Sequence, residues 1–438
     1  MAGKIAVSVG AVTIAIFLCA YGPAFLSQKL LGQTMDEALT PLDHPAIAYN
    51  SAPVHDRVTQ VTRDMAAGKN KIQVRKDGTG ALRDLLDTLG VKADSQTLVF
   101  SKTSFQASRI SPKNPRAIYF SDDVMVGYVR GSDLLEVAAL DPKQGFIFYS
   151  FDQSANPPRF DRRDVCLQCH ESAGTLGIPG IMIASVYPDA DGMPAFRGAQ
   201  NLTDHRTRFE DRWGGWYVTG THADMHHLGN AVGHERDHPE VLDTRGTLNL
   251  TNLTKKFDTT GYLAGASDIV ALMTLEHQTR MSDLLIRVGW EGRVLEHDGD
   301  KASAALRNRY KADLESLVTY MLFADEAPLE GLVQGVSTFA RTFADRGPRD
   351  HQGRSLRDFD LNTRLFKYPL SYMVYSNAFD NLPAETRSQI YQRLFEVLSG
   401  RDQSPQFKRL SPEDRRAVVE ILRETKTGLP APFTSAGG

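Results

Sequence analysis

The stretch Val124–Phe151, VMVGYVRGSDLLEVAALDPKQGFIFYSF, decides how the centre of this chain folds. β-branched and aromatic residues alternate along it with smaller or polar ones, which is the period of a half-buried strand. Gly131-Ser132-Asp133 and Asp141-Pro142 are turn signals that divide it. The pattern predicts an antiparallel meander of three strands, Val124–Arg130, Leu134–Leu140 and Gly145–Phe151.

Two further strands are predicted upstream, at Thr97–Phe100 and Ala117–Phe120. Downstream, the meander runs into a loop rich in Pro, Arg and Asp, from Asn156 to Asp164. The loop leads directly to Cys166-Leu167-Gln168-Cys169-His170. The predicted sheet therefore delivers the chain to a short motif that carries chemistry.

Two cysteines separated by two residues and followed at once by histidine form the attachment pattern of a c-type haem. Each thiol adds across one vinyl group of the porphyrin, and the histidine binds the iron. The motif predicts one covalent haem c on Cys166 and Cys169, with His170 as the proximal ligand.

A zinc half-site and a redox dithiol are the alternatives for the same residues. The chain has 3 Cys, and the remaining one, Cys19, lies in the N-terminal apolar segment. A structural zinc site needs four ligands, usually from two such pairs. A thioredoxin-like dithiol usually sits between a strand and a helix, which the loop before Cys166 fits poorly. The cysteine count therefore favours haem.

The N-terminal segment predicts export. The segment from Ile5 to Leu26 carries no charge and is long enough for a membrane anchor. Gly22-Pro23-Ala24 also suits the cleavage site of a signal peptide. Either reading places the chain after Lys29 on the periplasmic side of a bacterial inner membrane, where c-type haem is attached. The net charge of −3 gives no reason to expect nucleic-acid binding.

After the motif, a hairpin is predicted from Ile181–Tyr187 and Pro194–Ala199, then a strand at Trp213–Thr221. From Ser267, a predicted helix cap, apolar spacing turns helical. Further helices are expected at Lys301–Phe323 and Leu329–Phe343, after Pro383 and after Ser411. The fold class is therefore α+β. The expected parts are an anchor or signal (1–29), a tether with short helices (30–95), a β-rich haem domain (96–260) and a helical domain covering the haem (261–438).

A sixth iron ligand decides whether the haem only passes electrons or also binds small molecules. Met193 stands in Met-Pro-Ala-Phe, the string that carries the distal methionine in many small cytochromes c, although it follows His170 too closely. His222 and His227 belong to a cluster of five histidines after the strand at Trp213–Thr221. His277 projects from the apolar stripe of its helix. A turn, a solvated loop and a satisfied core histidine are the respective alternatives.

Two features are candidates for contacts with the haem itself. Pro179 follows His170 by nine residues, and a carbonyl near this position fixes the proximal imidazole in small c-type cytochromes. Arg162, with Arg159 and Arg163, precedes the motif and suits haem propionates. An exposed charged turn explains these arginines equally well.

The motif resembles that of the c-type cytochromes. Longer strings are similar to a poorly characterised group of large, membrane-tethered, single-haem bacterial proteins, over roughly residues 95 to 425. They are Ser101-Lys102-Thr103-Ser104, Trp213-Gly214-Gly215-Trp216-Tyr217-Val218-Thr219-Gly220-Thr221-His222, Leu275-Glu276-His277-Gln278 and Phe366-Lys367-Tyr368-Pro369-Leu370-Ser371-Tyr372. The resemblance implies haem binding and electron transfer, and it supplies no substrate.

Three functions follow from these expectations. The first is electron transfer with a redox partner protein, through an iron closed by His or Met. The second is a haem enzyme of peroxidase or oxidase type, with an open sixth position and acid–base groups at His222 and His227. The third is a haem-based sensor or binding module. The single haem favours the first function, and the length of the chain favours the second.

Overall fold

The computed structural model describes residues 40–195, 201–233, 238 and 241–434. The predicted anchor or signal at residues 1–29 lies outside the described residues. Within the described part of the chain, no helix combines the length and the apolar character needed to cross a membrane.

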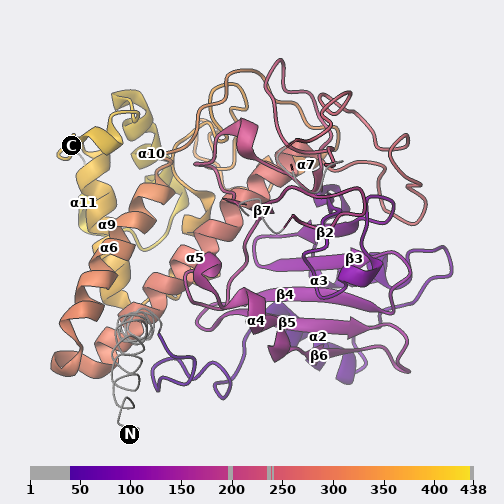
Figure 1. The fold of residues 1–438 in the computed structure, drawn as a ribbon. Helices are drawn as coiled ribbons and strands as arrows, with labels where there is room; N and C mark the ends of the chain where they lie inside the picture. Colours follow the sequence, from indigo (N-terminus) through magenta and orange to yellow (C-terminus); the bar gives the residue numbers. More distant parts are fainter. Residues whose placement is uncertain (1–39, 196–200, 234–237, 239–240, 435–438) are drawn as a thin grey trace, which may run out of the picture.

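A seven-stranded antiparallel sheet forms the centre of the molecule, with the strand order β6-β5-β4-β3-β2-β1-β9 (Figure 1). The five strands predicted between Thr97 and Phe151 are confirmed with small shifts at their ends. The strands are β1 Thr97–Val99, β2 Arg116–Phe120, β3 Val124–Val129, β4 Leu134–Asp141, β5 Gly145–Asp152, β6 Arg159–Arg162 and β9 Trp216–Tyr217.

Beyond the meander, the predicted strands are present only in part. β9 keeps two residues of the strand predicted at Trp213–Thr221, because Trp213 has a positive φ of 71° and Gly215 one of 86°. The hairpin predicted after the motif keeps its turn, since Ala195 donates its N–H to the carbonyl of Tyr187, and residues 196–199 of its second arm lie outside the described residues. Within the first arm, β7, Ala184–Ser185, pairs instead with β8, Asn201–Leu202. Pro188 and Pro194 meet only in an isolated bridge, since neither has an N–H to extend a ladder.

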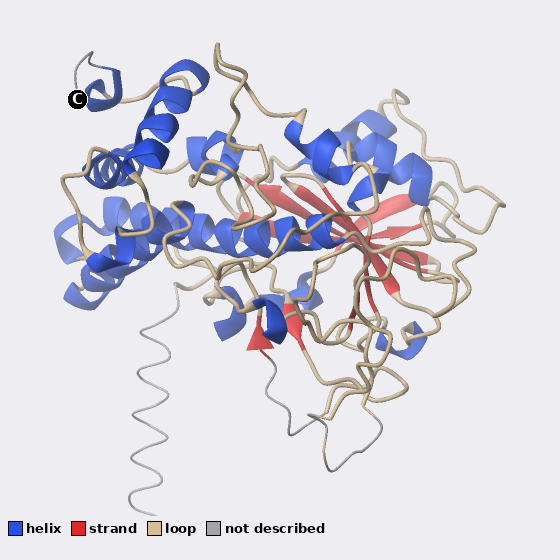
Figure 2. Cartoon of the chain, turned by 90° about the horizontal axis from the view of Figure 1, so that it is seen from above, coloured by secondary structure: helices blue, strands red, loops and turns tan. Residues whose placement is uncertain are grey.

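Both faces of the sheet are covered. Helices α2 (Arg57–Ala66) and α3 (Leu82–Leu89) pack on one face, and α3 ends at Gly90 with a positive φ of 76°. The other face contacts the helical C-terminal part through α5, which Figure 2 shows running from the helices to the sheet. This part contains α5 Ile269–Asp298, α6 Ala304–Met321, α7 Phe339–Ala344, α8 Asn377–Asp380, α9 Ala384–Leu398, α10 Pro412–Thr425 and α11 Ala431–Thr434.

The helical half confirms the expected class and corrects its details. Helix α7 covers only the end of the helix predicted at Leu329–Phe343. The cap of α5 is Asp268 instead of Ser267, whose hydroxyl donates to the carbonyl of Tyr217 and is therefore turned toward β9. Helix α5 is buried on nearly all sides, which explains why its apolar residues do not form a single stripe.

Asp268 joins two parts of the helical half. One carboxylate oxygen accepts the backbone N–H groups of Val270 and Ala271, and the other accepts those of Val336 and Ser337. The side chain is 2 % exposed, so water cannot replace these bonds.

Replacing Asp268 with Ala is expected to lower the free energy of unfolding by about 2–4 kcal/mol, because two buried and two partly buried N–H groups lose their acceptor. Ser411→Ala is the matched control, since Ser411 caps α10 through one bond to Asp414 and its loss costs about 1 kcal/mol. Denaturant unfolding of both variants measures the difference. Equal losses in the two variants would contradict this role of Asp268.

Candidate functional site

A cavity of about 500 Å³ lies between the sheet and the Cys166–His170 motif. Strands β2 to β5 contribute its floor, and the motif and residues 181–184 contribute its walls. The floor is mostly apolar, with small side chains at Gly127 and Ala138. The volume and the apolar lining are those of a site for a large organic ligand.

The motif forms a 3₁₀ turn, Asp164–Cys166, followed by the single-turn helix α4, Leu167–His170. Cys166 is half-buried and Cys169 is exposed, and both thiols are free. Both cysteines and His170 line the cavity. The two thiols and the imidazole therefore face one space, as the spacing of the motif predicts.

The imidazole of His170 is held from two sides. Its Nδ1 lies 2.9 Å from the carbonyl oxygen of Gly180, and its ring packs on Phe148 with centroids 4.8 Å apart. Burial lowers the pKa of His170, which keeps the ring neutral at neutral pH. Because a carbonyl only accepts, Nδ1 carries the proton and Nε2 keeps its lone pair. This is the tautomer that can bind a metal through Nε2.

The carbonyl that holds His170 belongs to Gly180, one residue after Pro179, which the sequence suggested for this contact. The carbonyl of Pro179 accepts the N–H of Phe146 on β5 instead, which ties the loop to the sheet. The next residue, Gly180, therefore turns its carbonyl to His170. A side chain on Gly180 has no room, since its Cβ would lie 2.3 Å from Oδ1 of Asp283.

Asp283 on α5 fixes this loop from the opposite side. Its Oδ1 accepts the N–H of Ile181 at 3.0 Å, and its side chain is fully buried. Burial raises the pKa of Asp283 well above its usual range. The buried carboxyl of Asp283 on α5 therefore fixes Ile181, and with it the preceding carbonyl of Gly180 that holds His170.

Positive charge gathers around the cavity. Lys102, Arg116 and Arg163 line it, and Glu136 is the one carboxylate among the described lining residues. Arg116 donates to Glu136 at 2.9 Å, while its buried Nε–H has no partner in the described part of the chain. No carboxylate of the described residues lies within ion-pair distance of Lys102 or Arg163. An anionic ligand fits this arrangement.

Arg162 points away from the cavity. It pairs with Asp164 at 2.9 Å and stacks over the ring of Tyr49. Its neighbour Arg163 follows the end of β6, donates its N–H to the carbonyl of Phe148 and lines the cavity. Because neighbouring residues of an extended chain face opposite sides, only one of the two arginines reaches the site.

The thiols do not have the surroundings of a reactive dithiol. Burial, followed by the nearby charge of Glu136, raises the pKa of Cys166, whereas redox-active cysteines have lowered values. The only group of metal-ligating side chains gathered within the described residues is His44, His297 and Asp298, which includes neither cysteine. The geometry therefore favours neither alternative to haem.

Three of the candidates for a sixth ligand lie away from the cavity. Met193 is 47 % exposed in a turn with Asp189, as its alternative reading predicts. His222 and His227 are buried together, with ring centroids 4.8 Å apart, and each accepts a backbone N–H. None of the three lines the cavity.

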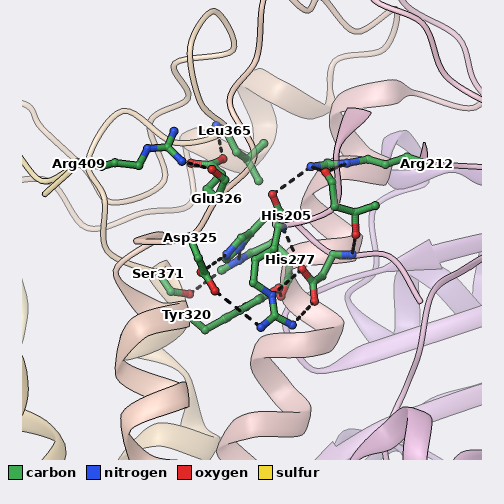
Figure 3. Close-up of polar contacts among 12 residues, drawn as sticks. His205, Arg212, His277, Tyr320, Asp325, Glu326, Leu365, Ser371 and Arg409 are labelled. Carbon is green, nitrogen blue, oxygen red and sulfur yellow. Dashed lines mark hydrogen bonds and ion pairs between the residues drawn. The ribbon is translucent and has the colours of Figure 1, made fainter. Parts of the chain in front are cut away.

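His277 is a satisfied core histidine. Its Nδ1 lies 2.9 Å from Nδ1 of His205, and its Nε2 lies 2.8 Å from the hydroxyl of Ser371 (Figure 3). Both ring nitrogens are therefore occupied by hydrogen bonds. His205 stacks on Tyr320 with centroids 4.0 Å apart, which completes the buried cluster. His277 is thus not placed to bind a metal in the cavity.

Several residues of the cavity carry no signal in the sequence. Arg116, Met125 and Glu136 read as ordinary strand residues until the register places them on the face toward the motif. The charges of Arg116 and Glu136 inside a β-former run are the one available hint, because buried strands seldom carry charge. Asp283 gives no such hint, because helix α5 contains several other charged residues.

Comparison with protein-family models, curated proteins and solved structures found no match. The resemblance based on the motif and the longer strings therefore stays a prediction.

Replacing Asp283 with Asn preserves an acceptor for Ile181 and removes the titration. Because the native state raises the pKa of Asp283, deprotonation favours the unfolded state, and wild-type stability falls as pH rises above about 4. The free energy of unfolding of Asp283→Asn, relative to that of the wild type, is expected to grow by about 1.4 kcal/mol per pH unit until the native carboxyl ionises. Thermal unfolding between pH 4 and pH 9 measures it.

Asp300→Asn is the control for this series, since Asp300 is an exposed carboxylate just beyond α5. Its stability curve is expected to run parallel to that of the wild type. A parallel curve for Asp283→Asn as well would show that Asp283 is ionised in the native protein.

Proposed function

We propose that this protein is a c-type haem protein of the periplasmic side of the bacterial inner membrane, and that it transfers electrons. Cys166 and Cys169 hold one haem through thioether bonds, and His170 binds its iron through Nε2. The haem supplies reversible one-electron chemistry at the iron. A redox protein is the expected partner, and the N-terminal segment is the expected link to the membrane.

The observation that carries this proposal is the state of His170. Its ring is neutral, its Nδ1 lies against a fixed carbonyl, and its Nε2 has no hydrogen-bond partner among the described residues. The same cavity is lined by both cysteines. A carbonyl bonded to the far nitrogen of a ligating histidine sets both its orientation and its basicity. A dithiol gives no reason for this arrangement of the third residue, and the described residues gather no set of zinc ligands around the two cysteines and His170.

The charges of the cavity fit the same ligand. Lys102, Arg116 and Arg163 against Glu136 leave an excess of two positive charges among the described lining residues. Haem carries two propionates on an otherwise apolar ring, so it matches both the excess and the apolar floor. Arg116 lines the cavity and supplies one of the charges that a propionate would pair with.

Electron transfer, rather than chemistry on a substrate, is favoured by exposure. Cys169 is exposed, and Val165 beside the motif is 40 % exposed. The edge of a haem bound to Cys169 therefore lies at the surface, where a partner protein can approach it. Electron exchange needs this proximity and no enclosed substrate site.

The expression of the chain in cells competent for cytochrome c maturation is expected to give one covalently bound haem. Cys166→Ala is expected to leave at most a single thioether bond and to lose most of the haem, because both thiols attach it. Gln168→Ala is the matched control, since it lies between the cysteines and its loss leaves attachment intact. Intact-mass measurement and haem staining of denatured protein check both variants.

A wild-type chain without covalent haem from such cells would contradict the proposed function. Bound zinc in its place would return the two cysteines to the half-site reading.

Arg163→Gln is expected to lower the reduction potential of the haem, by about 1 kcal/mol of redox free energy, since a nearby cation disfavours the more positive ferric state. Arg162→Gln is the control, because Arg162 is already neutralised by Asp164 and points away. Redox titration followed by visible absorption measures both. An equal or larger shift in Arg162→Gln would contradict the assignment of the two arginines.

A further inference from the structure

We infer that Met125 on β3 is the sixth ligand of the haem iron, bound through its sulfur. The inference rests on the proposed function, because it requires a haem on Cys166, Cys169 and His170. It replaces the four sixth-ligand candidates suggested by the sequence, which the fold places away from the cavity.

Few side chains of the cavity can reach an iron atom in addition to His170. Among the described lining residues they are Lys102, Met125, Glu136, Tyr149 and Met182. Both carboxylate oxygens of Glu136 already accept hydrogen bonds, from Ser104, Gln106 and Arg116. The hydroxyl of Tyr149 donates to Asp56 at 2.6 Å, and burial raises its pKa, so it stays a phenol. The ammonium group of a lysine side chain such as Lys102 has no lone pair to offer a metal. Two methionines therefore remain.

Met182 lies on the same side as His170. It is two residues from Gly180, whose carbonyl holds the His170 ring, so both belong to the wall behind the proximal ligand. Its sulfur packs against Gly174, at 2.7 Å from the position of a Cβ there. A sixth ligand must approach the iron from the opposite face, which Met182 does not reach from this wall.

Met125 lies across the floor from His170. The ladder pairs Phe148 with Ala138 and Ala138 with Met125, so these three residues form one row over β5, β4 and β3. Neighbouring strands are about 4.8 Å apart, so Phe148 and Met125 are separated by roughly 10 Å along the row. The His170 ring lies against the Phe148 end of this row.

Between Phe148 and Met125 the floor of the cavity is low, which leaves a slot above β4. Ala138 has only a methyl group, and Gly127, two residues after Met125, has no side chain. A Cβ at Gly127 would lie 3.2 Å from Oε2 of Glu136 and 3.7 Å from Cδ of Arg116, so these two side chains border the slot at this end. A flat ring standing over β4 presents one face to His170 and the other to Met125, which is 7 % exposed on a central strand.

A methionine in this position closes the iron and raises its reduction potential relative to a second histidine. The closed iron agrees with electron transfer and disagrees with a peroxidase or oxidase, which needs an open or labile position. Met125 is therefore the residue that decides between the two functions.

Three variants of the full-length holoprotein test the inference. Met125→Leu preserves the volume of the side chain and removes the sulfur, while Met125→His supplies a stronger ligand. Met182→Leu is the matched control from the opposite wall. For each, haem staining confirms attachment, and visible spectra, redox titration and the rate of carbon monoxide binding to the ferrous protein report the sixth position.

The wild type and Met182→Leu are expected to be low-spin and to bind carbon monoxide slowly. Met125→Leu is expected to become high-spin and to bind carbon monoxide at least tenfold faster. Met125→His is expected to restore a low-spin spectrum at a lower reduction potential, an outcome that loss of packing alone would not produce.

The inference is overturned if Met125→Leu keeps the spectrum of the wild type, or if Met182→Leu shows the change instead. A wild-type protein that is already high-spin and binds carbon monoxide as fast as Met125→Leu also overturns it, and favours the haem enzyme. In all these cases the haem is attached, so the proposed haem binding survives. Absence of covalent haem from the wild type contradicts the proposed function itself.

Discussion

One chain of hydrogen bonds connects the longest helix to the imidazole of the motif. Asp283 accepts the N–H of Ile181, and the carbonyl of the preceding Gly180 lies against Nδ1 of His170. The helix is buried on nearly all sides and contacts both the sheet and the other C-terminal helices. The orientation of His170 is therefore set by the packing of the whole molecule, although the motif itself occupies five residues.

The sheet serves two purposes on its two faces. The face toward α2 and α3 is filled by large apolar side chains, as a stable core requires. The opposite face has small residues at Gly127 and Ala138 and a charged pair at Arg116 and Glu136, and here a cavity remains. A ligand that fills this cavity adds apolar contacts that the chain cannot make alone. Haem binding is therefore expected to stabilise the fold.

The sequence predicted well what depends on neighbouring residues. The period of two between Thr97 and Phe151 gave the strands of the meander, and the spacing of Cys166, Cys169 and His170 gave a motif whose three side chains do face one cavity. It left open what distant segments decide, such as whether His277 binds a metal or is a satisfied core histidine. His277 finds its partner in His205, 72 positions away.

Smaller errors have equally physical causes. The carbonyl next to His170 belongs to Gly180, because the carbonyl of Pro179 already accepts the N–H of Phe146 on β5. The arginine that lines the cavity is Arg163, because the neighbouring Arg162 faces the opposite side. Met125 was not a candidate, since nothing in a strand pattern tells which face a later segment will cover. The register of the sheet supplies that information, and it exists only in the fold.

Anomalous diffraction at the iron absorption edge, from crystals of the holoprotein, tests the central claim most directly. We expect one iron peak inside the cavity, at bonding distance from Nε2 of His170, with continuous density from the ring to Cys166 and Cys169. No iron peak in the cavity, or a metal held by the two sulfur atoms themselves, would contradict it.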